Sequence, residues 1–155
     1  MMSFEAMQEK ASCLLKGVPS LLEREAFFLH ENKNRATAIT QAASLGNLAV
    51  LQVWLQDPSV TFKVLLHKTG SGWTAMHSAS SSASRNSEAT VQLLVQCLHK
   101  RVTHFNSLQL SPSTHCRLAD LISHLRPSDW GKKHYKGANL RKVCSKFGVD
   151  LPEWK

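Results

Sequence analysis

The chain has no apolar stretch long enough to cross a membrane. No run approaches the ~18 consecutive apolar residues of a spanning helix. The N-terminal segment carries Glu5 and Glu9 where a secretory signal would place lysine or arginine, and no apolar signal core follows. We therefore expect a protein without a signal peptide or membrane span that works in the cytoplasm, the nucleus or both.

Cysteine is sparse, and its spacing is irregular. The four cysteines, at positions 13, 97, 116 and 144, lack the paired spacing of a zinc site or a disulfide framework. We expect free thiols in a reducing compartment, with two disulfides as the alternative. Cys97 is expected to be an inert thiol on an apolar helix face. The eight histidines include no His-x-x-x-His pair, so no metal site is predicted.

The motifs of common enzyme classes are also missing. The sequence contains no Gly-x-Ser-x-Gly motif and no glycine-rich phosphate loop, and its acids are scattered. A nucleophile, a phosphate site or a pair of catalytic carboxylates therefore has no visible basis. We predict that the protein is not an enzyme and needs no cofactor.

Acidic residues are few, and the shortage is concentrated at one end. The 155 residues include 19 lysines and arginines against 11 aspartates and glutamates, a net charge of +8. Residues 1–99 hold eight basic and seven acidic residues, whereas residues 100–155 hold eleven and four. The last third should therefore favour acidic partners more than the rest. The length suits a single domain or a short repeat array.

Residues 1–32 predict two helices joined by a tight turn. Apolar residues recur at intervals of three and four from Phe4 onward, and Gly17 is a typical helix stop. Ser20 with Glu23 three residues later has the form of a capping box, which would open the second helix. We interpret this segment as an N-terminal helical hairpin or cap whose apolar faces need a further layer.

A more specific pattern begins at Thr37. The residues from Thr37 to Ala43 read Thr-Ala-Ile-Thr-Gln-Ala-Ala, and a Gly-Asn pair and a second helical stretch follow. This pattern resembles the ankyrin repeat, whose signature is Thr-Pro-Leu-His-x-Ala-Ala, then Gly-His, then Val-x-x-Leu-Leu. Thr40 stands where the family has histidine, and Trp54 stands where leucine is usual. The usual hydrogen bond between threonine and histidine is therefore not expected in this unit.

A second copy begins 37 residues later, at Thr74, and it includes the histidine, His77. Its second helix is expected at residues 90–95, after a serine-rich stretch from Ser80 to Ser87 that we expect to be an exposed loop. A third, degenerate or capping unit is predicted at residues 111–126. Its apolar face would be formed by Leu118, Leu121, Ile122 and Leu125.

The resemblance covers residues 33–126. It implies an all-α fold, namely an ankyrin-type helical-repeat solenoid with degenerate caps and a basic C-terminal helical extension. Small residues would allow the first helices of neighbouring units to pack closely, and these are Ala42, Ala43 and Ala79. Larger apolar residues would fill the core between units, and these are Ile39, Leu51, Leu55, Met76, Leu93 and Leu94.

The resemblance also implies a function, because such stacks usually serve as scaffolds or adaptors that bind other proteins. The implied binding residues lie before and along the first helix of each unit, and they are Asn34, Arg35, Gln41, Ser44, Ser71, Trp73 and Ser78. Trp73 is the strongest candidate, since tryptophan is enriched among interface anchors. The alternative is that Trp73 is mostly structural.

Residues 127–155 form a basic extension outside the resemblance. Its apolar positions from Leu140 to Phe147 predict a short helix that ends at Gly148. Six basic residues could line a patch there, and these are Lys132, Lys133, Lys136, Arg141, Lys142 and Lys146. With Trp130 and Tyr135 available for stacking, the alternative function is binding of nucleic acid or another acidic surface. A solvated charged face is the simpler interpretation of the same residues.

Overall fold

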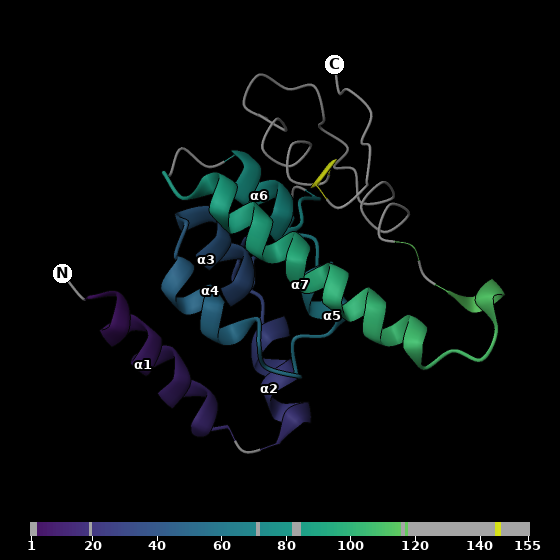
Figure 1. Ribbon diagram of the computed structural model, residues 1–155. Coiled ribbons are helices and arrows are strands. Elements are labelled where there is room, and N and C mark those ends of the chain that lie inside the picture. Colours follow the sequence, from purple (N-terminus) through teal and green to yellow (C-terminus); the bar gives the residue numbers. More distant parts are fainter. Residues whose placement is uncertain are drawn as a thin grey trace.

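The computed structural model describes residues 3–18, 20–70, 72–81, 85–115, 117 and 145–146, with only the backbone of 80 and 81. Within these residues the protein is all-helical and contains no strand, as the sequence predicts (Figure 1). The α-helices are α1 (Phe4–Lys16), α2 (Leu21–Leu29), α3 (Ala38–Leu45), α4 (Leu48–Trp54), α5 (Phe62–Leu65), α6 (Ala75–Ser81) and α7 (Ser87–Ser107). A single 3-10 helix, η1, follows α7 (Pro112–Thr114).

Short-range signals in the sequence define the helix ends. Ser20 Oγ accepts a hydrogen bond of 3.1 Å from the Glu23 amide and opens α2. Thr37 Oγ1 accepts from the Thr40 amide at 3.3 Å and opens α3. Gly46 ends α3 with a φ of 68°, a left-handed conformation that glycine adopts without steric cost. The predicted start of α2 and the predicted end of α1 near residue 17 are confirmed.

The helices pack in two layers. The short helices α3 and α6 lie against each other, and α4 and α7 pack on their outer side (Figure 1). On the opposite side of α4 from α7, the N-terminal helix α1 packs along α4, while α2 contacts α3 and α5. Ala43 of α3 and Ala79 of α6 are completely buried. The prediction that small residues let these two helices approach closely is confirmed.

The core runs continuously from α1 to α7. Of the six residues predicted to fill the space between units, Ile39, Leu51, Leu55, Met76 and Leu94 are buried. Leu93, the sixth, packs against this core but is only partly buried, and it lines a groove between α4 and α7.

Trp54 joins three helices at one end of this core. Its ring makes edge contacts with Phe27 and Phe28 of α2, at centroid distances of 6.0 and 5.6 Å. Its indole Nε1 donates a hydrogen bond of 3.3 Å to the Ala11 carbonyl of α1. Trp54 therefore provides contacts that hold both N-terminal helices to α4.

The second half of the chain departs from the expected boundaries. The helix predicted at residues 90–95 is the 21-residue α7, and α6 extends to Ser81, into the predicted serine loop. Ser87, at the far end of that loop, is buried, and its Oγ donates to the Ala79 carbonyl at 2.6 Å. This hydrogen bond satisfies a polar side chain in the interior, so the predicted exposed loop is wrong at both ends.

The described residues include the beginning of the predicted third unit and two residues of the predicted extension. The unit begins with η1, where Ser111 Oγ accepts from the Ser113 amide at 3.4 Å. Its predicted apolar face, from Leu118 onward, lies outside the described residues. The same holds for the predicted extension at residues 127–155, of which 145 and 146 alone are described.

Candidate protein-binding face

Two turns precede the helices α3 and α6 and have the same backbone hydrogen bonds. In the first turn, residues 32–36, the Asn32 amide donates to the Ala36 carbonyl at 3.0 Å and the Arg35 amide donates to the Asn32 carbonyl at 2.9 Å. In the second turn, residues 69–73, the Thr69 amide donates to the Trp73 carbonyl at 2.9 Å and the Gly72 amide donates to the Thr69 carbonyl at 2.9 Å. Corresponding residues are 37 positions apart.

The two turns also share their unusual backbone conformation. Arg35 has a φ of 59° and Gly72, its counterpart, has a φ of 84°. Glycine adopts this region freely, whereas arginine does so at some energetic cost. In the first turn, Asn32 Oδ1 accepts hydrogen bonds from the amides of Asn34 and Ala36, at 2.8 and 3.0 Å, and stabilises the strained conformation.

The turns touch each other through one close backbone contact. The Gly70 amide donates to the Asn34 carbonyl at 3.1 Å. A Cβ atom placed on Gly70 would lie 3.2 Å from this oxygen, closer than most such contacts in proteins. Glycine at this position therefore lets the second turn lie directly beside the first.

The caps that follow the two turns are related but not identical. In the second unit, Thr74 Oγ1 and His77 Nδ1 lie 2.7 Å apart, and both residues are buried. In the first unit the corresponding pair is Thr37 Oγ1 and Thr40 Oγ1, at 3.0 Å. The Thr40 hydroxyl thus occupies the position of the histidine. In the first unit, a hydrogen bond between the hydroxyls of Thr37 and Thr40 therefore corresponds to the Thr74–His77 hydrogen bond of the second unit.

The predicted binding residues lie along this pair of turns and helices. Asn34 and Arg35 are exposed on the first turn, and Gln41 and Ser44 are exposed one helical turn apart on α3. Trp73 is half-buried beside Thr74. This intermediate burial fits both interpretations of Trp73, an interface anchor and a structural residue.

Ser78 is the remaining described member of the predicted set. It is partly buried on α6, 37 positions after Gln41 on the adjacent helix α3. Ser71 lies outside the described residues. The described members form what we call the α3–α6 face, which comprises Asn34, Arg35, Gln41, Ser44, Trp73 and Ser78.

An ionic cluster that the sequence analysis missed holds the first turn in place. Glu31 Oε2 accepts from Arg35 Nε at 3.1 Å and lies 3.2 Å from His67 Nε2. The hydrogen bond from Arg35 is the main reason why the pKa of Glu31 is lowered, and His67 contributes to the same effect. The i,i+4 spacing of Glu31 and Arg35 was a visible signal for their pairing, but His67 is too distant in sequence to be recognised.

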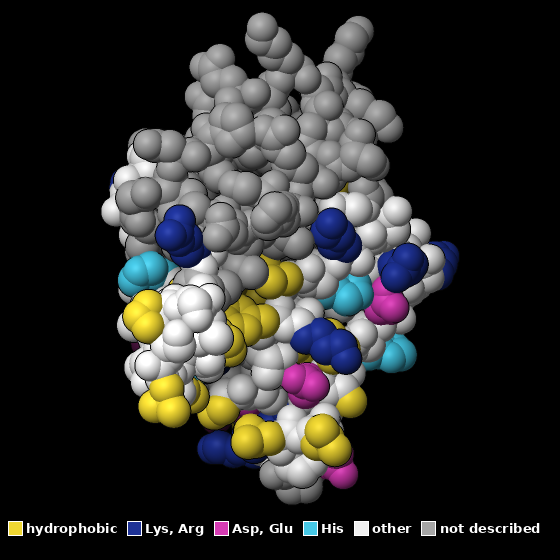
Figure 2. Space-filling model, turned by 90° about the vertical axis from the view of Figure 1, so that its right-hand side faces the viewer, with side chains coloured by type: hydrophobic (Ala, Val, Ile, Leu, Met, Phe, Trp, Pro, Cys, Tyr) yellow, Lys and Arg dark blue, Asp and Glu magenta, His cyan; other side chains and the backbone are white. Residues whose placement is uncertain are grey.

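Of the six residues of the predicted basic patch, the structure describes one, Lys146. Lys146 Nζ lies 3.8 Å from Glu88 Oε1, in the first turn of α7, and both side chains are well exposed. The other five predicted members, Lys132, Lys133, Lys136, Arg141 and Lys142, lie outside the described residues. Among the described side chains coloured in Figure 2, lysines and arginines outnumber acidic residues.

The described part of the chain lacks two features of other functional classes. It contains no group of three or more histidine, cysteine or acidic side chains that could hold a metal ion. None of its helices combines the length and the apolar content that a membrane span requires. Cys97 is buried, as expected, and its Sγ donates to the Leu55 carbonyl at 3.4 Å. Comparisons with protein-family models, with curated proteins and with solved structures found no match to this chain.

Proposed function

We propose that this chain binds another protein through the α3–α6 face, as a scaffold or adaptor module built from ankyrin-type units. The observation that carries the proposal is the repetition, at a spacing of 37 residues, of one turn, one cap and one helix. The two copies lie side by side, so that equivalent side chains form a row. Repeated units that stack in this way typically present an extended surface to a partner.

The chemistry of the face suits recognition of a protein. Gln41 offers an amide donor and acceptor, Arg35 offers a guanidinium whose Nε is already oriented by Glu31, and Trp73 offers a partly exposed aromatic surface. Such a mixture of polar groups around an aromatic residue is typical of protein interfaces. We further propose that the protein is not an enzyme, since the groups that this face offers are those of a binding surface.

The test is a quantitative pull-down with matched variants of the full chain. Gln41 and Gln92 are both exposed helical glutamines, and Gln92 lies on α7, outside the proposed face. We expect Gln41→Arg to lose the partners that wild-type protein retains, and Gln92→Arg to keep them. Trp73→Ala should weaken the same interactions by about 2 kcal/mol, roughly thirtyfold in Kd, if the ring is an anchor. Equal retention by all four proteins would overturn the proposal.

The second candidate function is binding of nucleic acid or another acidic surface through the C-terminal extension. It is favoured by the eleven basic and four acidic residues of positions 100–155. Phosphate contacts would make this binding strongly dependent on salt. Reversing the charge of Lys132, Lys133 and Lys136 together in the full chain should lower the salt concentration of elution from immobilised RNA. An unchanged elution position would exclude this function for the three lysines.

A further inference from the structure

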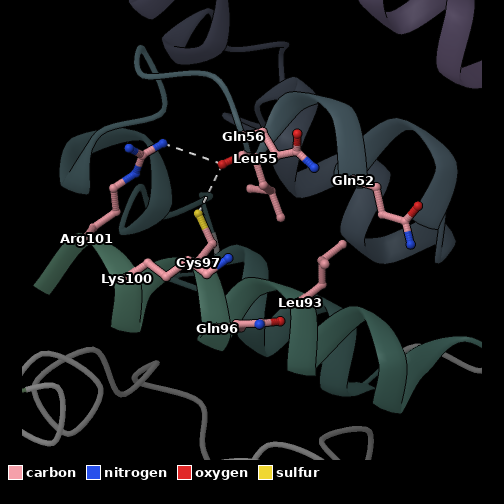
Figure 3. A pocket seen from close by; sticks show the side chains of 8 residues that line it. All are labelled: Gln52, Leu55, Gln56, Leu93, Gln96, Cys97, Lys100 and Arg101. Atoms are coloured by element: carbon pink, nitrogen blue, oxygen red, sulfur yellow. Dashed lines mark hydrogen bonds between the residues drawn. The ribbon is translucent and has the colours of Figure 1, made fainter. Parts of the chain in front are cut away.

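A groove runs across the outer layer of helices, away from the α3–α6 face. Its smaller part, between α4 and α7, has a volume of about 290 Å³ and is lined by Leu55, Cys97 and Arg101 among others (Figure 3). Its larger part has a volume of about 660 Å³, extends to α1 and is lined by residues that include Gln8, Glu9 and Ser12. The two parts are continuous because they share five lining residues, Gln52, Gln56, Leu93, Gln96 and Lys100. We call this hollow the glutamine groove.

The lining is unusually rich in side-chain amides. The chain has seven glutamines, and four of them line this groove: Gln8 of α1, Gln52 of α4, Gln56 just after α4 and Gln96 of α7. Gln8 Nε2 donates to Gln52 Oε1 at 3.0 Å, so one amide bond already crosses from α1 to α4. Each amide carries two donor hydrogens and an acceptor oxygen, so Gln52 keeps its donors and Gln8 keeps its acceptor. The groove therefore offers donors and acceptors side by side, as the backbone of an extended peptide does.

The groove also has an apolar position and a charge gradient. Leu93 is partly exposed on α7 and lines both parts of the groove, where it can contact an apolar side chain. Glu9 lines the larger part of the groove but not the smaller part, whereas Arg101 lines the smaller part but not the larger part. Arg101 Nη2 is fixed by the Asp57 carbonyl at 2.8 Å. Within the described residues, no carboxylate pairs with Lys100, so the α7 side of the groove carries uncompensated positive charge.

These observations distinguish between classes of ligand. A lipid chain would leave the amides of four glutamines and the ammonium group of Lys100 without hydrogen-bond partners, which disfavours it as the ligand. A nucleic acid would require a row of cations along the backbone, whereas Glu9 lies at one end of this groove. An extended peptide needs alternating donors and acceptors, a site for an apolar side chain and a complement for its charges.

We propose that the glutamine groove binds an extended peptide segment of another protein. An apolar side chain of the peptide packs on Leu93, its backbone pairs with the glutamine amides, and a carboxylate lies beside Lys100. This site is formed by α1, α4 and α7, so it is separate from the α3–α6 face and does not depend on the proposed function of that face. The module would then hold two partners at once.

The experiment uses the intact chain and a display library of random twelve-residue peptides. Selected peptides are synthesised, and their affinity is measured by fluorescence anisotropy against two matched variants, Gln96→Trp and Gln92→Trp. Both glutamines are exposed on α7 one turn apart, but only Gln96 lines the groove. We expect enrichment of peptides with a carboxylate close to an apolar residue. The Gln96→Trp variant should lose at least tenfold in affinity, and Gln92→Trp should match the wild type.

Charge supplies an independent readout. Lys100→Glu should lower the affinity for acidic peptides about fivefold at low salt, and the difference in affinity should be smaller at high salt. The proposal is overturned if no peptide is enriched, or if selected peptides bind Gln96→Trp as tightly as wild-type protein. If the selected peptides lose affinity for the Gln41→Arg variant instead, they bind the α3–α6 face, and this result would also overturn the proposal. A concentration-dependent dimer that Gln96→Trp abolishes would assign the groove to a second copy of this chain and would likewise overturn it. Circular dichroism of each variant establishes that a loss of binding is not a loss of fold.

Discussion

Replacing Trp54 by leucine tests whether the N-terminal helices are held by this one side chain. Leucine keeps the position apolar and removes both the aromatic ring and its N–H donor. It removes two edge contacts with phenylalanine rings, at 5.6 and 6.0 Å, which are worth about 2 kcal/mol together. It also removes the hydrogen bond to the Ala11 carbonyl, worth about 1 kcal/mol. The smaller apolar surface costs about 1 kcal/mol more.

The expected loss is therefore about 3 to 4 kcal/mol in the free energy of unfolding, a large fraction of the ~5 to 15 kcal/mol typical of a domain. Urea unfolding followed by circular dichroism at 222 nm measures this loss. Trp54→Phe is the graded control, because it keeps a ring and loses the indole donor, and it should cost about half as much. A loss below about 1 kcal/mol for Trp54→Leu would refute the reasoning, since α1 and α2 would then be held by other contacts.

Three further predictions follow from the geometry. Glu31 has a lowered pKa in the folded protein, so its contribution to stability is present above the unfolded pKa and is lost as the pH falls through the folded pKa; unfolding free energies measured at pH 7 and pH 3 should differ less for Glu31→Gln than for wild type. Burial raises the pKa of the Cys97 thiol, whereas Cys13 is exposed; mass-spectrometric mapping after brief iodoacetamide treatment should find Cys13 labelled at least tenfold more than Cys97, and equal labelling would contradict the burial. Gly70→Ala should push the second turn away from the Asn34 carbonyl, cost about 1 kcal/mol in stability and weaken partners of the α3–α6 face; a partner affinity equal to that of the wild type would show that the contact between the turns is not needed for binding.

Features that depend on neighbours in sequence could be predicted. The helix start at Ser20 was predicted because the capping side chain and the amide it accepts from are three residues apart, and Thr37 caps α3 through the same spacing. The end of α3 at Gly46 follows in the same way from the freedom of glycine at positive φ. The burial of Ala43 and Ala79 followed from the repeated pattern, which placed both at the contact between adjacent helices.

Features that join distant segments could not be predicted. The length of α7 was missed because its apolar pattern weakens after residue 98, where contacts such as Phe62 on Phe105 support the helix. The burial of Ser87 depends on a carbonyl eight residues earlier that only the α6–α7 packing brings near. For Trp73 the sequence left two roles open, and its half-buried position leaves the choice to the binding experiment.

By itself, the sequence determined the helical class, the ends of several helices and the 37-residue repetition that leads to the proposed binding face. These properties are local, or they repeat local patterns, so each can be recognised without knowing how the chain folds back on itself. Only the tertiary structure decided which surfaces exist between helices. The pairing of Glu31 with His67 and the convergence of four glutamines on one groove are examples. They depend on the packing of α1, α2, α4, α5 and α7, which brings together segments that are up to 88 positions apart in the sequence.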